Sequence, residues 1–133
     1  MIFKMKTILS NKIFNILDNS PNALSANQIM DQLDRLDLKP NKTTIYRILD
    51  KLVNKNLASI IRLNTGISYY ELAKSHHSHH HHFFCNKCQT LFCLDTCHLE
   101  QYNINLEQLL PSKKFQITDH DFNLYGICEP CAQ

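Results

Sequence analysis

Two Cys-x-x-Cys pairs are the residues of this chain whose types and spacing best suit metal chemistry. The first pair is Cys85 and Cys88 in "CNKC", and the second is Cys128 and Cys131 in "CEPC". Each such turn directs two thiolates at one point, so two turns together offer the tetrahedral sulfur site that Zn²⁺ prefers. The pattern therefore predicts a closed, structural zinc site. Four unconnected buried thiols or a redox dithiol are the alternatives, although no thioredoxin-like βαβ pattern surrounds either pair.

A histidine run leads directly into the first pair. The stretch "SHHSHHHHFFCNKC" contains six of the chain's eight histidines. Alternate side chains of a β-strand point to opposite faces, so we expect His79 and His81 to share one face and His80 and His82 to share the other. One short run can then supply ligands to two further metal sites.

The overall composition limits what the chain can be. Its 133 residues, 44% of them hydrophobic, suffice for one compact domain or two very small ones. The 14 Lys and Arg residues nearly balance the 12 Asp and Glu residues, which gives no global basic signal for nucleic acid. No apolar run approaches the ~20 residues of a membrane-spanning helix, and the lysine-interrupted N-terminus lacks a signal-peptide pattern. We expect a cytoplasmic protein with no membrane partner, in which cysteines bind metal or stay reduced.

The elements that must position these ligands fall into two units. All cysteines and histidines lie beyond residue 75, which predicts a boundary between residues 1–73 and residues 74–133. In the first unit, apolar residues at helical spacing, a capping box at Ser25 and Gln28, and the amphipathic segment 41–56 predict three helices. Two β-rich runs around an Asn-Thr-Gly turn then predict a hairpin. This order is that of a winged helix-turn-helix, whose third helix enters the major groove of DNA.

The third expected helix has a polar face that suits DNA. The candidate contacts to phosphates and base edges, including one cation beside the hairpin, are Lys42, Thr43, Thr44, Tyr46, Arg47 and Arg62. A small helical domain with an ordinary solvated face is the alternative, and this half of the chain leaves both interpretations open.

Five stretches of the chain together resemble the ferric uptake regulator (Fur) family of metal-responsive repressors. In chain order they are "TTIYRILDKL", "YYEL", "HHHHFFCNKC", "DHDFNLYGIC" and "EPC", from about residue 43 to residue 131. The resemblance implies an α+β fold with an N-terminal winged helix-turn-helix, residues 1–73, and a small C-terminal α/β dimerisation domain, residues 74–133, that contains the four-cysteine zinc site. It also implies that a homodimer binds a double-stranded DNA operator when metal is bound.

The resemblance assigns roles to individual residues. The structural zinc ligands are Cys85, Cys88, Cys128 and Cys131. The sensory ligands between the domains are Glu71, His80, His82 and, at a position where the family often has a carboxylate, Cys93. The ligands of an additional site inside the dimerisation domain are His79, His81, Glu100 and His120. Tyr46 and Arg47 match the recognition-helix positions that meet DNA.

Cys93 decides which regulatory metal we expect. A thiolate is a softer ligand than a carboxylate and favours Zn²⁺ over Fe²⁺ or Mn²⁺. The alternative is a buried apolar thiol within "LFCL". The sequence thus predicts a zinc-sensing repressor of metal uptake with Zn²⁺ at both the structural and the regulatory site. We expect no enzymatic activity, because no H-E-x-x-H motif is present and metal-linked switching requires no bond chemistry. An iron or peroxide sensor of the same family and a histidine-rich metal store or chaperone are the rival functions.

Overall fold

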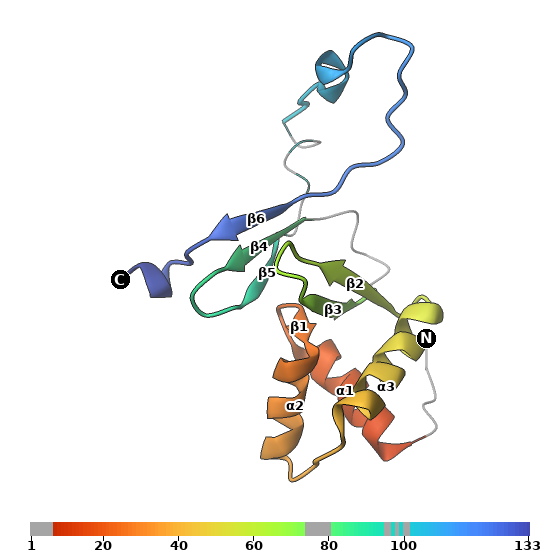
Figure 1. The fold of residues 1–133 in the computed structure, drawn as a ribbon, viewed down its shortest axis with the longest axis vertical. Helices are drawn as coiled ribbons and strands as arrows, with labels where there is room; N and C mark the ends of the chain where they lie inside the picture. Colours follow the sequence, from red (N-terminus) through yellow and green to blue (C-terminus); the bar gives the residue numbers. More distant parts are fainter. Residues whose placement is uncertain (1–6, 74–80, 95–96, 98, 100–101) are drawn as a thin grey trace.

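The computed structural model describes residues 7–73, 81–94, 97, 99 and 102–133, and within them the chain forms two three-stranded sheets (Figure 1). The first half contains α1 (Ile8–Asn19), β1 (Leu24–Ser25), α2 (Ala26–Arg35), α3 (Lys42–Asn54), β2 (Ala58–Arg62) and β3 (Ser68–Leu72). The second half contains β4 (His81–Cys85), β5 (Leu91–Leu94), the 3₁₀ turn η1 (Leu106–Leu109), β6 (Asn123–Gly126) and the 3₁₀ turn η2 (Pro130–Ala132). The expected order of three helices and a hairpin is therefore present.

Side-chain caps explain where the three helices begin. The Thr7 side chain accepts a hydrogen bond from Ser10 N–H at the start of α1, and Asn41 Oδ1 accepts one from Thr44 N–H at the start of α3. The capping box at α2 is present in full: Ser25 Oγ accepts from Gln28 N–H at 3.2 Å, and Gln28 Oε1 accepts from Ser25 N–H at 3.0 Å. These bonds satisfy amides that the first turn of a helix leaves without a carbonyl partner.

The main core lies between the three helices and the first sheet. Its fully buried side chains come from every helix: Ile13, Ile29, Leu33, Ile45, Leu49 and Leu52. The first sheet has the order β1-β3-β2 with antiparallel pairing throughout, and it adds Tyr70 to the same core. Ile8, the first residue of α1, is 77% exposed.

The second sheet holds the metal-ligand candidates. Its order is β5-β4-β6, with β4 antiparallel to β5 and parallel to β6. Four of the five residues of the central strand β4 are buried. In Figure 1 the helices lie below the first sheet and the second sheet lies above it.

The two sheets contact each other through a second apolar cluster. Its buried members are Ala23, Leu63, Tyr69, Phe84 and Leu91, so both halves contribute. An antiparallel bridge pairs Ala23 with Leu91. Burial of these side chains stabilises this arrangement of the two halves. The boundary expected between residues 73 and 74 stays a prediction.

Hydrogen bonds from the turn after Cys88 and from β6 also join the two halves. The Gln89 carbonyl accepts from the Tyr69 hydroxyl at 2.6 Å and from Gln28 Nε2 at 3.0 Å. The Tyr125 hydroxyl accepts from Asn64 N–H at 3.0 Å. Gln89 has a φ of 62°, a left-handed conformation that aims its carbonyl at the first sheet from the turn that follows Cys88.

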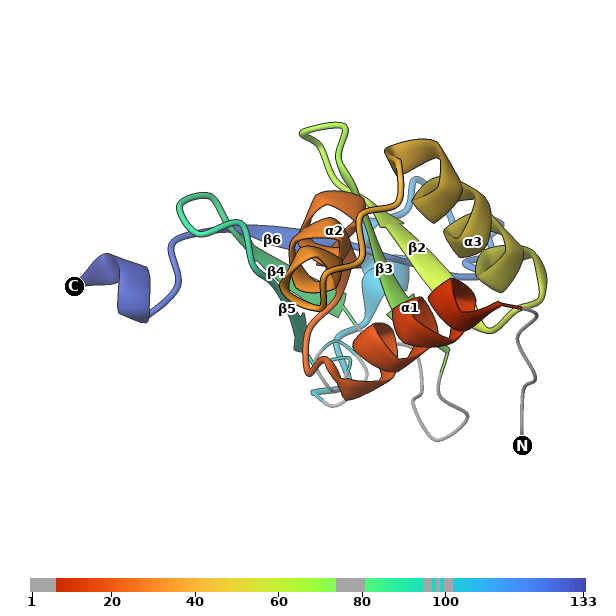
Figure 2. The same cartoon turned by 90° about the horizontal axis from the view of Figure 1, so that it is seen from below.

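The remainder of the chain extends away from these contacts. The segment that contains η1 extends far from the second sheet (Figure 1), and the C-terminal turn η2 projects away from the helices (Figure 2). Among the described residues, no helix combines the length and apolar character needed to cross a membrane.

Candidate metal centres

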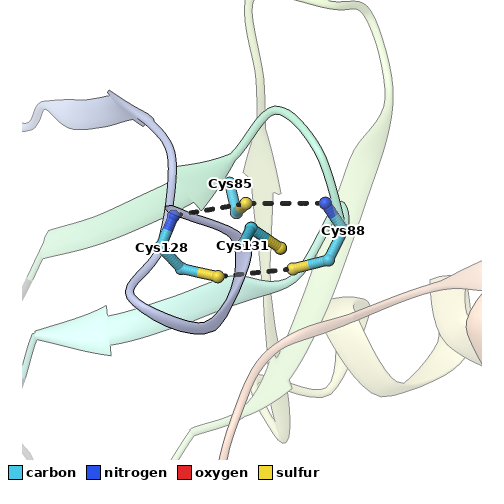
Figure 3. Close-up of side chains that lie close together, drawn as sticks. All are labelled: Cys85, Cys88, Cys128 and Cys131. Carbon is cyan, nitrogen blue, oxygen red and sulfur yellow. Dashed lines mark hydrogen bonds between the residues drawn. The ribbon is translucent and has the colours of Figure 1, made fainter. Parts of the chain in front are cut away.

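Four cysteines converge on one point at one end of the second sheet, where the parallel strands β4 and β6 both finish. Cys85 ends β4 and Cys88 lies in the turn after it, whereas Cys128 and Cys131 come from the C-terminal segment around η2 (Figure 3). Their four sulfur atoms all lie within 4.8 Å of one another, and the Sγ atoms of Cys88 and Cys128 are 3.7 Å apart. Four convergent sulfurs form the donor set of a structural Zn²⁺ site.

The electrostatics of this four-cysteine cluster favour a cation. Cys85 Sγ accepts hydrogen bonds from Cys128 N–H at 3.4 Å and from Cys88 N–H at 3.5 Å. These bonds lower the pKa of Cys85 to about 6, so one thiolate is already present at neutral pH. The pKa of Cys131 rises to about 12, first because its thiol hydrogen-bonds to Cys128 and then because burial disfavours its thiolate. Four clustered sulfurs cannot all ionise without a positive charge between them, and these four cysteines would hold a Zn²⁺ ion that supplies it.

A second cluster, called here the hinge cluster, joins the two sheets. It consists of Glu71 from β3 in the first sheet, His82 from β4 and Cys93 from β5 in the second, with one ligand atom of each within 4.8 Å of the others. His82 Nε2 lies 3.1 Å from Glu71 Oε1, and His82 stands directly opposite Cys93 in the β4–β5 ladder. His82 is 6% exposed, whereas Glu71 and Cys93 are partly buried. His80, also expected here, lies outside the described residues.

A third cluster, called here the Cys97 cluster, lies on the opposite face of β4. It consists of His81, Cys97 and His120, again with ligand atoms within 4.8 Å of one another. Cys97 Sγ is 3.2 Å from His120 Nε2, and the His81 and His120 ring centroids are 5.1 Å apart. His81 also stacks on Phe122 at 3.9 Å between centroids. His79 and Glu100, which the resemblance assigns to this site, lie outside the described residues.

Sequence reasoning missed Cys97. The signal was available in the cysteine count, because the two Cys-x-x-Cys pairs account for four of the six cysteines and Cys93 for a fifth. Cys97 follows Cys93 by four residues in "CLDTCH". Only the fold shows that it meets His120, since no local spacing pattern links residues so distant in sequence.

The expected DNA-binding side chains lie on and near α3. Lys42, Thr43, Tyr46 and Arg47 are exposed, and so is Arg62 at the end of β2. Thr44 is half-buried and hydrogen-bonds to Asn41 Oδ1 through both its amide and its hydroxyl, so it belongs to the helix cap. Contact of these residues with DNA stays a prediction.

Comparison with known proteins places this arrangement in a family. The model of the ferric uptake regulator family matches residues 6–125. The chain belongs to the ferric uptake regulator family. It is 31% identical over 121 residues to the ferric uptake regulation protein of Legionella pneumophila, covering 90% of this chain and 85% of that protein. It is 25% identical to the zinc uptake regulation protein of Mycobacterium tuberculosis over 119 residues, covering 90% of this chain and 88% of that one.

A solved structure shows the same architecture. The crystal structure of the Vibrio cholerae ferric uptake regulator superposes with a TM-score of 0.72 at 25% identity, covering 93% of this chain and 92% of that chain. The expected α+β fold class, a winged helix-turn-helix followed by a small α/β domain with a four-cysteine cluster, is therefore confirmed. Members of the family are metal-responsive transcription regulators, so this chain is a regulator and not an enzyme.

Proposed function

We propose that this chain is a zinc-sensing, DNA-binding repressor that controls metal uptake as a cytoplasmic homodimer. The observation that carries the proposal is the hinge cluster, in which one ligand comes from the sheet of the DNA-binding half and two come from the other sheet. Zinc in the four-cysteine cluster has a structural role in the proposal. The hinge cluster is the switch, because it alone among the three described clusters draws ligands from both sheets.

The coupling follows from linkage. Glu71 moves with the first sheet, whereas His82 and Cys93 move with the second. A metal ion supplies positive charge that all three donors share, and they can share it only while the two sheets keep this arrangement. Binding therefore raises the population of the arrangement that the cluster requires. A site built on one sheet alone would bind both arrangements equally and shift nothing.

The donors of the hinge cluster support zinc as the regulatory metal. Thiolate and imidazole are ligands of tetrahedral Zn²⁺ sites, and a thiolate disfavours the harder ions Fe²⁺ and Mn²⁺. The position of Cys93, with its sulfur near Glu71 and His82, supports the ligand role over a purely apolar one. The likeness to a zinc uptake regulation protein supports the same choice, although the relative from Legionella is named for iron. Fe²⁺ and Mn²⁺ are the alternatives.

Exposed apolar side chains support the homodimer. They lie on the segment around η1, on β6 and just after β6: Tyr102, Ile104, Leu109, Phe115, Leu124 and Ile127. Burial of such side chains against a second copy of the chain would remove their apolar surface from water. A second copy of the chain would bring a second α3, and two recognition helices fit a palindromic operator.

A selection from a random-sequence DNA duplex library tests the function. The full chain is incubated with the library and a thiol reductant in separate selections with Zn²⁺, Fe²⁺ and Mn²⁺. The affinity for any enriched duplex is then measured against the free concentration of each metal. We expect enrichment of a palindromic duplex and DNA binding that saturates at the lowest free concentration with Zn²⁺. Failure of every metal to enrich a duplex would contradict the repressor function and favour a metal store. Activation at lower free Fe²⁺ or Mn²⁺ would overturn the choice of zinc.

A further inference from the structure

The Cys97 cluster has the features of a built site and a composition that the family resemblance does not provide. That resemblance places His81 and His120 in an additional site with a carboxylate, Glu100, and assigns nothing to residue 97. In the structure a thiol joins the two histidines. His81 is 2% exposed and Cys97 is 4% exposed, so the donors are removed from water.

The geometry of the three donors is convergent. Cys97 comes from the chain after β5, His81 from the first position of β4, and His120 from the segment that leads into β6. Three segments distant in sequence thus bring a sulfur and two imidazoles within 4.8 Å of one another. Phe122 stacks on the face of the His81 imidazole and holds that ring in place. Ligands held by packing in this way lose little freedom when a metal binds.

A buried thiol hydrogen-bonded to a histidine is the alternative explanation. The 3.2 Å distance between Cys97 Sγ and His120 Nε2 is compatible with such a bond. That bond needs only one histidine, however. A second imidazole, that of His81, also lies beside the same sulfur. One thiolate and two imidazoles are three of the four ligands that a tetrahedral Zn²⁺ site takes.

We infer that Cys97, with His81 and His120, forms a thiolate-containing metal site that takes Zn²⁺ and disfavours Mn²⁺ and Fe²⁺. Cys97 is the residue that determines this specificity, because a thiolate among the donors makes the donor set softer. The role of this site in metal sensing rests on the proposed function. The hinge cluster and the Cys97 cluster then each contain a thiolate, and they lie on opposite faces of β4. Of two adjacent residues, His82 belongs to the hinge cluster and His81 to the Cys97 cluster.

Cobalt spectroscopy tests the inference in the full chain. Protein loaded with one equivalent of Zn²⁺, which fills the four-cysteine cluster first, is titrated with Co²⁺ under a reductant. Thiolate bound to Co²⁺ gives sulfur-to-metal charge-transfer absorption in the near ultraviolet, and Cys93→Ser removes the hinge thiolate from that signal. We expect Cys93→Ser to retain the absorption, and the further change Cys97→Ser to abolish it while the zinc content is unchanged.

A second variant keeps the test decisive if the buried serine disturbs folding. His120→Ala in the Cys93→Ser background leaves the Cys97 thiol in place but removes a nitrogen ligand. We expect it to weaken Co²⁺ binding to Cys97 by at least about tenfold, the size of loss that even outer-shell partners of a metal can cause. Asp121→Asn is the matched control, because Asp121 is an exposed carboxylate next to His120. This change should leave the absorption unchanged.

The competing metals complete the experiment. Added Zn²⁺ should remove the charge-transfer absorption of the Cys93→Ser protein, whereas excess Mn²⁺ should not. Absence of the absorption in Cys93→Ser, or its persistence after Cys97→Ser, would overturn the inference. No DNA is present, so the outcome does not depend on the repressor function. Conversely, metal-dependent DNA binding that survives in Cys97→Ser would leave the hinge switch intact whatever the spectra show.

Discussion

Removal of one hydroxyl group, in Tyr69→Phe, tests how the turn after Cys88 is held against the first half of the chain. The Tyr69 hydroxyl donates to the Gln89 carbonyl at 2.6 Å, and Gln89 follows the zinc-ligand candidate Cys88. The carbonyl keeps a second donor, Gln28 Nε2 at 3.0 Å, so the change leaves no buried acceptor unsatisfied. The phenyl ring keeps its edge contact with Phe84. We therefore expect the loss of one hydrogen bond and nothing more, about 0.5–1.5 kcal/mol in the free energy of unfolding.

The same hydroxyl predicts a pH dependence. Burial, reinforced by the charge of Cys88, raises the pKa of Tyr69 above its usual value of 10. As pH rises, the unfolded tyrosine ionises first, so the folded state binds its proton more tightly than the unfolded state. The stability from Tyr69 is complete below pH ~10 and is lost as pH climbs through the raised pKa. The advantage of the wild type over Tyr69→Phe should therefore shrink above pH ~10.

Urea unfolding followed by circular dichroism, at fixed free Zn²⁺, measures both effects. Tyr125→Phe is the matched control, because its hydroxyl accepts from the exposed amide of Asn64, which water can satisfy instead. We expect that control to stay within about 0.5 kcal/mol of the wild type. Equal stability of Tyr69→Phe and the wild type at pH 8, or a difference that persists undiminished at high pH, would refute the role given to this hydroxyl.

Three further changes test the metal and DNA assignments. Cys128→Ser removes one of four convergent sulfurs and should lower both zinc content and the melting temperature; unchanged values of both would reject the structural zinc site. Arg47→Ala should weaken operator binding by ~1–3 kcal/mol if Arg47 reads a base, or lower the salt slope by about one if it contacts phosphate, whereas Lys114→Ala in the other half should do neither. Cys93→Asp should lower the ratio of zinc to manganese activation of DNA binding, because a hard carboxylate replaces a soft thiolate; an unaltered ratio would return Cys93 to a packing role.

Local signals in the sequence predicted much of the first half because their physics is local. The capping box at Ser25 and Gln28 involves residues three apart, and the hairpin turn needs Gly66, whose φ is 86°. The strand β1 was not predicted, since the two residues Leu24 and Ser25 are too few to show an alternating pattern. They pair with the edge of β3 because they lie in the connection between α1 and α2, which pack beside that strand.

Contacts between distant segments explain what the sequence could not provide. The spacing within each Cys-x-x-Cys pair indicates a turn that brings its two sulfurs together, and two such turns predict a site of four sulfurs. In contrast, the contact of Cys97 with His120 depends on the path of the chain between β5 and β6, and the contact of Tyr69 with Gln89 depends on how the two sheets pack. Neither has a sequence pattern of its own.

The most direct test of the central claim is the DNA affinity of His82→Ala measured against free Zn²⁺, with zinc content assayed on the same samples. His82 is the hinge ligand that hydrogen-bonds across to Glu71, so its loss should disconnect metal binding from DNA binding while the four-cysteine zinc remains. We predict that His82→Ala loses zinc-dependent DNA binding and that His120→Ala, whose side chain belongs to the Cys97 cluster, keeps it. A His82→Ala protein that responds to zinc as the wild type does would contradict the account.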